Sequence, residues 1–298
     1  MEIVIGIFLA VILFFIIVMV IDGNRFVVRE YTIESDKIKE EQKLVVLADL
    51  HNKKYGSNNE KLLKAIGDVN PDMVLTAGDI LTAKPGKSFE TAASFMEKVA
   101  AKYPIYYGLG NHEYRMKIYP EDYGDAYDRY ISRLKKAGII ILDNETAEIR
   151  IRKMKKSESD SDYFILRITG ASIERLYYKR FRKIKMDEFY LNGLIGTPKE
   201  DVYEILLAHN PEYFEEYAAW GADLVLSGHV HGGIMKLPIL GGVISPKLVL
   251  FPKYDGGRFE EKDSTMILSR GLGMHTLPIR VFNPGELVVI HLLPCKSK

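Results

Sequence analysis

The chain has 298 residues, 47% of them hydrophobic, and a formal net charge of +1 at pH 7. This apolar content excludes an intrinsically disordered chain, and the length suffices for one large globular domain or two small ones. The near-neutral charge argues against broad nucleic-acid binding, so no nucleic-acid partner is expected. The single cysteine, Cys295, excludes a scaffold of internal disulfides.

An uncharged apolar segment of 19 residues, 3–21, lies near the start of the chain. As a helix rising about 1.5 Å per residue it would match the roughly 30 Å hydrocarbon core of a bilayer. The alternatives are a cleaved signal peptide and a buried core helix. A signal peptide needs a positive leading region and an Ala-x-Ala-like site, but only Met1 and Glu2 precede the segment and no such site follows it. A core helix needs a polar face, which is absent. We therefore expect a transmembrane anchor at residues 1–22.

Basic residues lie on one side of this segment only. Arg25, Arg29, Lys37 and Lys39 follow it, and none precedes it. The positive-inside rule therefore predicts a single-pass membrane protein whose globular part faces the cytoplasm. Polar residues 23–42 are expected to form a linker with an edge strand at 26–33, and residues 43–298 the globular domain.

Strand-like and helix-like apolar patterns alternate after residue 43, as in α/β proteins. The expected helices are 58–69, 88–101 and 125–137. The expected strands of this part are 43–48, 73–77, 105–109 and 139–142. Strands at 148–152 and 163–168 are expected to pair around a charged hairpin, 153–162. After Gly233 the expected strands, which we assign to a second sheet, are 234–238, 247–251, 264–268, 279–282 and 287–292.

The segment 175–185 holds six basic and three aromatic residues. One interpretation is a solvated amphipathic helix. The other is a cap that offers positive charge to a phosphorylated or anionic-lipid substrate. Residues 153–190 are therefore a possible cap or insertion in the domain.

Five strand-like segments are each followed at once by residues that can bind a metal. These residues are Asp49 and His51; Asp79; Asn111, His112 and Glu113; His209; and His229 and His231. The carboxyl ends of strands in α/β sheets are where ligands bind, so the five segments predict one shared site. A lone His or Asp after a strand is more often a turn former. That alternative would require five coincidences.

The histidines of Gly228-His229-Val230-His231-Gly232 are one residue apart. In an extended segment alternate side chains point to the same side, so both imidazoles are expected to converge on one point. A pair of cations held by His and Asp could clamp a phosphoryl group and lower the pKa of a bridging water. Mixed imidazole and carboxylate ligands suit Mn, Fe, Co or Zn more than Ca or Mg. His275 and His291 lack such a context and are expected to be structural.

In this order, the five motifs resemble those of the calcineurin-like metallophosphoesterases, over about residues 43–293. The resemblance implies a four-layered α/β/β/α fold and hydrolysis of a phosphoric ester by a hydroxide that bridges two divalent transition-metal ions. It implies that the first ion is bound by Asp49, His51 and His231, that Asp79 bridges both ions, and that the second is bound by Asn111, His209 and His229. His112 would be the proton donor or transition-state stabiliser, with Glu113 orienting it.

One position departs from the family pattern. The family commonly has a second aspartate three residues after the bridging one, where this chain has Thr82. That aspartate usually supports a ligand without binding the metal, so the departure concerns the tuning of the site.

The C-terminal motifs around Ser269-Arg270-Gly271 and Phe282-Asn283-Pro284 resemble a membrane-associated branch of the family. That branch includes bacterial phosphodiesterases and UDP-2,3-diacylglucosamine pyrophosphatases, which implies a lipid-linked or membrane-proximal phosphodiester or pyrophosphate substrate. The alternatives are a tethered phosphatase or cyclic-nucleotide phosphodiesterase acting on soluble substrates, and a non-catalytic scaffold that binds a protein partner. The oligomeric state and the substrate are left open.

Overall fold

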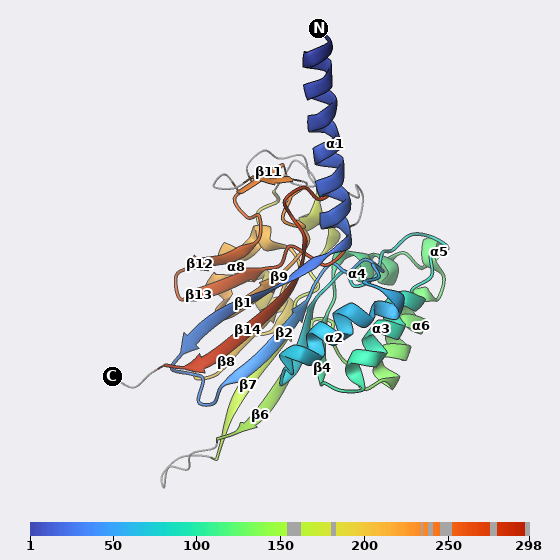
Figure 1. Cartoon of the computed structure of the whole chain (residues 1–298). Coiled ribbons are helices and arrows are strands. Elements are labelled where there is room, and N and C mark those ends of the chain that lie inside the picture. Colours follow the sequence, from blue (N-terminus) through green and yellow to red (C-terminus); the bar gives the residue numbers. More distant parts are fainter. Residues whose placement is uncertain are drawn as a thin grey trace.

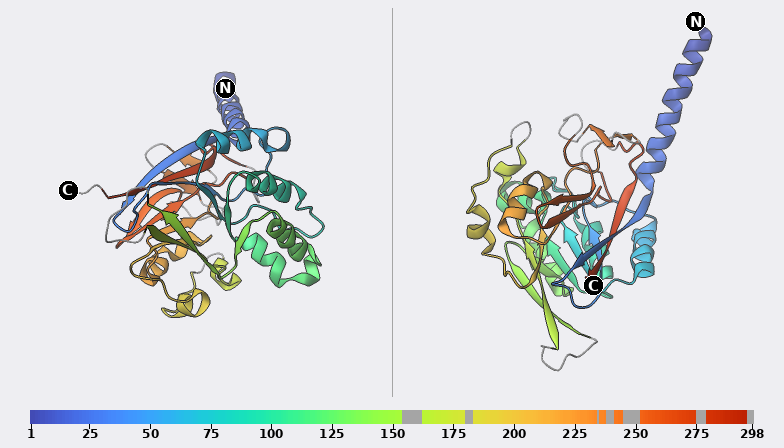
Figure 2. Two further views of the ribbon diagram at one scale, coloured as in Figure 1. Left: turned by 90° about the horizontal axis from the view of Figure 1, so that it is seen from below. Right: turned by 90° about the vertical axis from the view of Figure 1, so that its left-hand side faces the viewer.

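Two six-stranded sheets form the centre of the molecule. The computed structural model describes residues 1–153, 162–179, 183–233, 235–237, 241–244, 252–274 and 279–295. The sheets face each other across one apolar core, and a further apolar core on the outer face of each sheet packs against helices. The layers therefore follow the expected α/β/β/α order, with one additional helix, α1, that stands away from them (Figures 1 and 2).

The first sheet contains the strands that follow the anchor and the last strand of the chain. Its order is β1 (Phe26–Ser35), β14 (Gly285–Pro294), β2 (Gln42–Leu47), β3 (Met73–Ala77), β4 (Ile105–Gly108) and β5 (Ile140–Leu142). Strands β2 to β5 are parallel and mostly buried, which explains their nearly continuous apolar sequences. The strand expected at 287–292 is present as β14, but its assignment to the second sheet was wrong. It pairs antiparallel to β2 and parallel to β1.

The second sheet has the order β12 (Gly257–Glu261), β13 (Ser264–Leu268), β9 (Leu224–Ser227), β8 (Tyr203–Leu207), β7 (Tyr163–Gly170) and β6 (Thr146–Arg152). The strand expected at 234–238 instead forms a separate two-stranded hairpin of β10 (Met235–Leu237) and β11 (Gly241–Ile244). Residues 279–282 form no strand beyond a single bridge at Val281. The strand expected at 247–251 and most of the hairpin 153–162 lie outside the described residues, as does His275.

Helices cover the outer face of each sheet. Against the first sheet lie α2 (Glu60–Val69), α3 (Glu90–Ala100) and α6 (Ala126–Lys136), and α4 (Asn111–Ile118) and α5 (Pro120–Tyr123) precede α6 in the chain. Against the second lie α7 (Tyr190–Ile195) and α8 (Phe214–Trp220). Helix α3 buries Phe95, Met96 and Val99 at the spacing of one helix face. The basic segment forms only a 3-10 helix, Arg175–Tyr178, so its interpretation as a longer amphipathic helix was wrong for its described residues.

The core between the sheets fixes how their strand ends meet. Leu75 of β3 and Ile205 of β8 are fully buried in it, and each such side chain contributes roughly 1.5–3 kcal/mol to folding. Where β4 ends, a Cβ on Gly108 would lie 2.7 Å from Cβ of Leu207, so only glycine permits this close approach. The carboxyl ends of β4 and β8, from different sheets, are thereby brought together.

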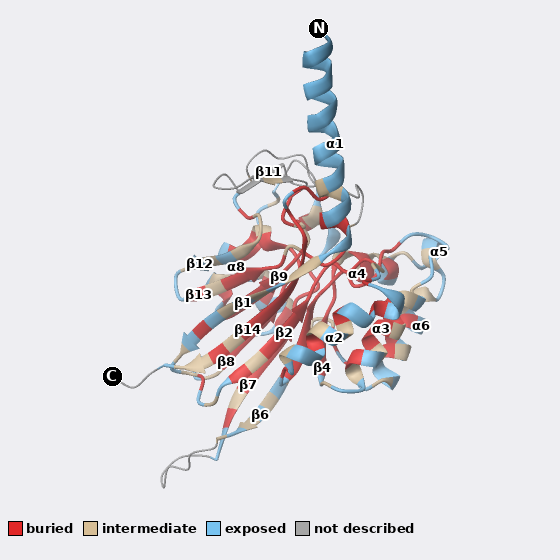
Figure 3. Cartoon of the chain, in the orientation of Figure 1, coloured by how far each residue is buried: buried red, intermediate tan, exposed pale blue. Residues whose placement is uncertain are grey.

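Helix α1 (Glu2–Asn24) extends outward from the domain with its apolar side chains exposed (Figure 3). Its only buried residues are Asp22 and Gly23 at its end. This exposure excludes a buried core helix, one of the alternatives for residues 3–21. By length and composition α1 is able to cross a membrane.

Candidate metal centre

Two buried aspartates occupy the turns that follow β2 and β3. Asp49 and Asp79 are 0% and 2% exposed. The two turns are joined by main-chain hydrogen bonds, from Asp49 N to Gly78 O (3.0 Å) and from His51 N to Asp79 O (3.1 Å). Two carboxylates from neighbouring parallel strands are therefore held beside each other in the interior.

The backbone at these turns is unusual. Asp49, His51, Asp79, His229 and His231 all have positive φ, of 49°, 51°, 56°, 74° and 52°. Such left-handed conformations are uncommon for residues other than glycine, and they concentrate at functional sites, where the surroundings hold them in place. The expectation of an extended segment at 229–231 was therefore wrong. The two imidazoles are aimed by a turn, and each belongs to a different group of side chains.

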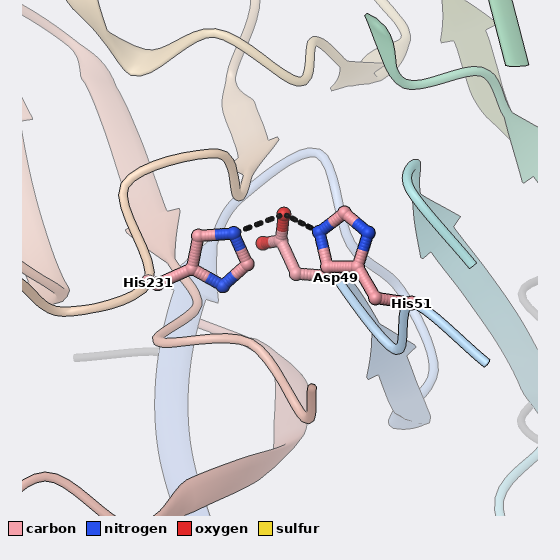
Figure 4. A group of neighbouring side chains, drawn as sticks. All are labelled: Asp49, His51 and His231. Atoms are coloured by element: carbon pink, nitrogen blue, oxygen red, sulfur yellow. Dashed lines mark ion pairs between the residues drawn. The ribbon is translucent and has the colours of Figure 1, made fainter. Parts of the chain in front are cut away.

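The first group contains Asp49, His51 and His231, whose candidate ligand atoms all lie within 4.8 Å of one another. Nε2 of His51 and Nε2 of His231 lie 3.7 and 3.6 Å from the same oxygen, Oδ1 of Asp49 (Figure 4). These separations leave room for one cation between the three side chains. This is the set that the family resemblance implies for the first ion.

The second group contains Asp79, His209 and His229, again within 4.8 Å of one another. Nδ1 of His209 lies 2.6 Å from the carbonyl oxygen of Ala77, so this nitrogen donates and Nε2 points toward the carboxylates. That Nε2 is 3.1 Å from Oδ2 of Asp79 and 3.8 Å from Oδ1 of Asp49. His209 therefore lies at the junction of the two groups.

Asp79 also lies close to the first group. Nε2 of His51 is 3.8 Å from Oδ2 of Asp79, so this carboxylate reaches a member of the first group while belonging to the second. That geometry fits a bridging ligand between two cations. Asn111, the first residue of α4, completes the expected set, and its amide oxygen Oδ1 is buried without a hydrogen-bond partner. A buried oxygen in this state suits a metal ligand.

His112 is held so that one ring nitrogen faces the carboxylates. Its Nδ1 accepts a hydrogen bond from Ala83 N (2.9 Å), and its main-chain N donates to Oδ1 of Asp79 (2.8 Å). Because Nδ1 accepts, the proton of a neutral ring is on Nε2. Nε2 lies 3.9 Å from Oδ2 of Asp79, so His112 presents an N–H to the space beside the two groups.

Glu113 supports the Asp79 turn. Its fully buried carboxylate accepts from the main-chain N of Asp79 (2.9 Å), Ile80 (2.9 Å) and Gly110 (3.1 Å), and from the Tyr107 hydroxyl (2.9 Å). These bonds give Glu113 a place in positioning Asp79, whereas Ala83 supplies the described contact to the His112 ring. Burial, with the charge of Asp79, raises the pKa of Glu113.

Thr82 takes the position of the aspartate that the family commonly has. Its Oγ1 lies 3.3 Å from Nδ1 of His51 and 3.3 Å from the His51 carbonyl oxygen. A hydroxyl can donate to the carbonyl and accept from the ring N–H. Thr82 thus orients His51 without adding a negative charge, which is the physical consequence of the departure.

The electrostatics of the carboxylates favour cation binding. Burial alone would raise the pKa of Asp49, but His231 and the other adjacent imidazoles outweigh it and lower the pKa. Burial would likewise raise the pKa of Asp79, and His209, followed by His112, lowers it well below its ordinary value. Both groups are therefore ionised near neutral pH.

His209 and His231 have opposite charge preferences. Burial would lower the pKa of His209, yet Asp79 and Asp49 raise it to about 10. Burial lowers the pKa of His231 to about 3 against the attraction of Asp49. A proton on His209 therefore occupies the position that a cation would take, while His231 is already in the neutral form that binds metals.

Two residues of the site were missed by reasoning from the sequence. The ring of Tyr178 stacks edge-on against His229 with centroids 5.1 Å apart, and burial raises the pKa of its hydroxyl well above the usual value. The aromatic residues within the basic segment were the available signal. Arg280 is buried and donates to the carbonyl oxygens of Arg270, Gly271 and Gly273, at 2.9, 3.1 and 2.6 Å. It thereby shapes the loop that passes over Asp49.

His291 lies outside the centre, as expected, and pairs with Glu30 at 3.0 Å. The ligands expected from the sequence lie in the turns after β2, β3, β8 and β9, and Asn111, His112 and Glu113 lie in the first turn of α4, which follows β4. These strands belong to both sheets, so the ligands approach one another from two sides.

Comparison with known proteins gives a consistent result. A family model described as calcineurin-like phosphoesterase matches residues 42–233. Uncharacterized metallophosphoesterases of Campylobacter jejuni and Aquifex aeolicus are each 28% identical, over 89% and 88% of this chain and 63% and 90% of their own lengths. A Danio rerio protein named transmembrane protein with metallophosphoesterase domain is 26% identical over 84% of this chain and 53% of its own. This chain thus spans less than two thirds of the Campylobacter and Danio relatives.

The family match covers most of the domain and all five segments that carry the candidate ligands, and members of this family use divalent metal ions. The buried carboxylate pair and the imidazoles that converge on it supply ligands of the kind such ions need. The chain belongs to the calcineurin-like phosphoesterase family.

Proposed function

We propose that this protein is a membrane-anchored phosphohydrolase with a binuclear metal centre, and that it cleaves a lipid-linked or membrane-proximal phosphodiester or pyrophosphate. The single observation that carries the proposal is the geometry at Asp79. Its carboxylate belongs to the second ligand group and also lies 3.8 Å from His51 of the first group. Two cations bound on either side of it would be close enough to act on one phosphoryl group.

The residues of the centre have separate roles in this proposal. Asp49, His51 and His231 would hold one ion, and Asn111, His209 and His229 the other, with Asp79 between them. When bound, Mn, Fe, Co or Zn would polarise the phosphoryl oxygens and lower the pKa of a bound water.

His112 would assist the leaving group. The Ala83 amide fixes Nδ1 as an acceptor, so the N–H at Nε2 faces the substrate space and can donate its proton to the departing oxygen. The ring of Tyr178 lies edge-on beside His229, one of the candidate ligands of the second ion. Its protonated hydroxyl suits a hydrogen bond to a phosphate oxygen.

Helix α1 supports membrane attachment. Its apolar side chains are exposed, and its last turn is bonded to the domain through Asp22. A permanent anchor accounts for both features, and the bond from Asp22 to the domain favours it over a cleaved signal peptide. The basic residues after α1 favour a cytoplasmic domain. An enzyme held at a bilayer meets lipid-linked substrates first, and a UDP-2,3-diacylglucosamine-like pyrophosphate is the leading candidate.

The reaction is tested by assaying the purified full chain, loaded with Mn, Fe, Co or Zn, against bis-p-nitrophenyl phosphate. We expect turnover that is abolished in Asp79→Asn and strongly reduced in His112→Ala. Failure to turn over with each of these metals, or unchanged turnover in both variants, would overturn the assignment of the centre.

The second candidate is a tethered phosphatase or cyclic-nucleotide phosphodiesterase that acts on soluble substrates. The same metal centre would serve this function if α1 only tethers the protein to the membrane and does not select its substrate. Turnover of the full chain in lipid vesicles is compared for a lipid-linked pyrophosphate, a soluble monophosphate and a cyclic nucleotide. Preference for either soluble compound would support this candidate against the lipid-linked one. A non-catalytic scaffold would bind no metal at all.

A further inference from the structure

Phe282 is an exposed aromatic residue on an unusual backbone. Its side chain is 39% exposed, and its φ of 53° lies in the left-handed region, which bulky residues rarely adopt. Its ring centroid lies 6.3 Å from that of Phe14 and 6.3 Å from that of Phe15, both in α1. A conformation of this cost persists only when the surroundings hold it. Here it places an apolar ring on the side of the membrane-spanning candidate.

The loop that carries Phe282 is fixed to the end of α1. Asp22 is 2% exposed, and its Oδ2 accepts from the main-chain N of Asn283 at 3.0 Å. Its other oxygen, Oδ1, pairs with Arg25 at 2.8 Å. The loop is therefore bonded directly to the end of the anchor, which fixes the position of Phe282 along α1.

The length of α1 then determines where Phe282 lies relative to a bilayer. Phe15 is six residues before Ile21, the end of the apolar segment, which corresponds to about 9 Å of helix. The portion from residue 3 to Phe15 would span only roughly 20 Å, less than the roughly 30 Å of a hydrocarbon core. The helix can cross the core only if the turns beside Phe282 are also inside the membrane.

We propose that Phe282 is a second point of membrane contact, inserted beside α1 below the level of the lipid headgroups. This inference rests on the proposed anchoring by α1. Single exposed apolar side chains are common and need no explanation. Phe282 differs because it continues the apolar surface of α1 and is held there by a left-handed backbone and a buried carboxylate. Aromatic side chains suit the boundary between the hydrocarbon and the headgroups.

This contact brings the metal centre to the membrane surface. Nδ2 of Asn283 donates to the carbonyl oxygens of His231 and Gly233, both at 2.8 Å. Asn24, the last residue of α1, accepts from Nζ of Lys53 (3.2 Å), two residues beyond His51. Both histidines of the first ligand group are therefore near contacts with the membrane-attached part.

Nitroxide spin labels on single cysteines test the proposal. The full chain carries Cys295→Ser, and one label is placed through Ile12→Cys in α1, Phe282→Cys, or Phe189→Cys. Phe189 is the matched control because it is 68% exposed and precedes α7, which lies across the domain from α1 (Figure 2). Each protein is reconstituted in vesicles of phosphatidylcholine and phosphatidylglycerol. Collision of the label with oxygen, which enters lipid, is compared with collision with a water-soluble nickel complex.

We expect the oxygen-to-nickel collision ratio to be several-fold higher at residues 12 and 282 than at residue 189. A high ratio at residue 12 together with a ratio at residue 282 that equals the control would overturn the second contact and leave the anchor intact. A low ratio at residue 12 would refute the anchoring itself, and the inference about Phe282 would fail with it. Circular dichroism of each variant verifies that the labelled protein is folded.

Discussion

Between the two sheets, Leu75 and Ile205 are fully buried, and their strands keep regular pairing. At the carboxyl ends of these same layers, Asp49, Asp79 and His231 have left-handed backbones and bring charged or polar atoms together in the interior. Apolar burial in the first region stabilises the fold, whereas backbone strain and the desolvation of charged groups in the second region reduce its stability. Stability and activity should therefore respond to different substitutions.

Among residues outside the ion-binding set, the largest expected effect on activity comes from His112→Ala. Loss of a positioned general acid reduces kcat by about 10²–10⁴-fold. The urea midpoint of the protein in detergent micelles should stay near that of the wild type. His291→Ala, which removes the partly exposed pair with Glu30, is the control and should keep full kcat. A kcat for His112→Ala within twofold of the wild-type value would show that His112 is not the general acid.

The core should respond in the opposite way. Ile205→Ala leaves a cavity between the sheets and should destabilise the protein by about 2–5 kcal/mol, measured by urea denaturation in micelles. The kcat of the folded, metal-loaded fraction should be nearly unchanged. Ile140→Ala is the control, since Ile140 is 43% exposed and its loss should change stability little. A larger loss of kcat than of stability would show that the two regions are not separable in this way.

Substitutions of Thr82 test a residue that supports a candidate ligand, His51, without being a ligand itself. Thr82→Val keeps the shape of the side chain but removes its hydrogen bonds with His51, and loss of such a supporting contact lowers metal affinity about 10–100-fold. Thr82→Ser keeps the hydroxyl and serves as the control. Equilibrium dialysis against Mn measures both. Equal affinity in Val and Ser variants would mean that the hydroxyl does not orient His51.

The smallest expected effect is the release of a proton from His209 when a metal ion binds. The pKa of His209 is raised to about 10 in the metal-free protein, so the ring is protonated at neutral pH and must lose this proton to bind a cation. Metal affinity should therefore fall as the pH is lowered. Calorimetric titration with Mn in two buffers of different protonation enthalpy should show different heats. His209→Asn should reduce the difference by about one proton. Identical heats for the wild type in both buffers would contradict the raised pKa.

The sequence allowed the position of the centre to be predicted, because strand-like runs followed at once by Asp or His are a local feature. The convergence of the resulting turns follows from parallel packing, and the structure brings Asp49, Asp79 and the imidazoles together. The metal-binding roles of these residues stay predictions until an ion is observed.

Other features depend on contacts between distant residues. The apolar pattern of 287–292 indicates a strand but not the sheet to which it belongs. In the structure β14 pairs between β1 and β2, and this pairing depends on residues far away in the sequence. The segment 229–231 was wrongly predicted to be extended because the alternation of side chains holds only for regular strands. In the structure the main-chain N of His229 donates to the Asp49 carboxylate at 2.9 Å, a contact between distant residues. The place of Tyr178 beside His229 likewise depends on tertiary packing, which no local pattern encodes.

Crystals of the full chain soaked with Mn, examined by anomalous diffraction, test the central claim most directly. The account predicts two peaks on either side of the Asp79 carboxylate, separated by about 3.5–4 Å, with Asp49 and His231 at one and His209 and His229 at the other. A single peak, or peaks that do not contact Asp79, would contradict it.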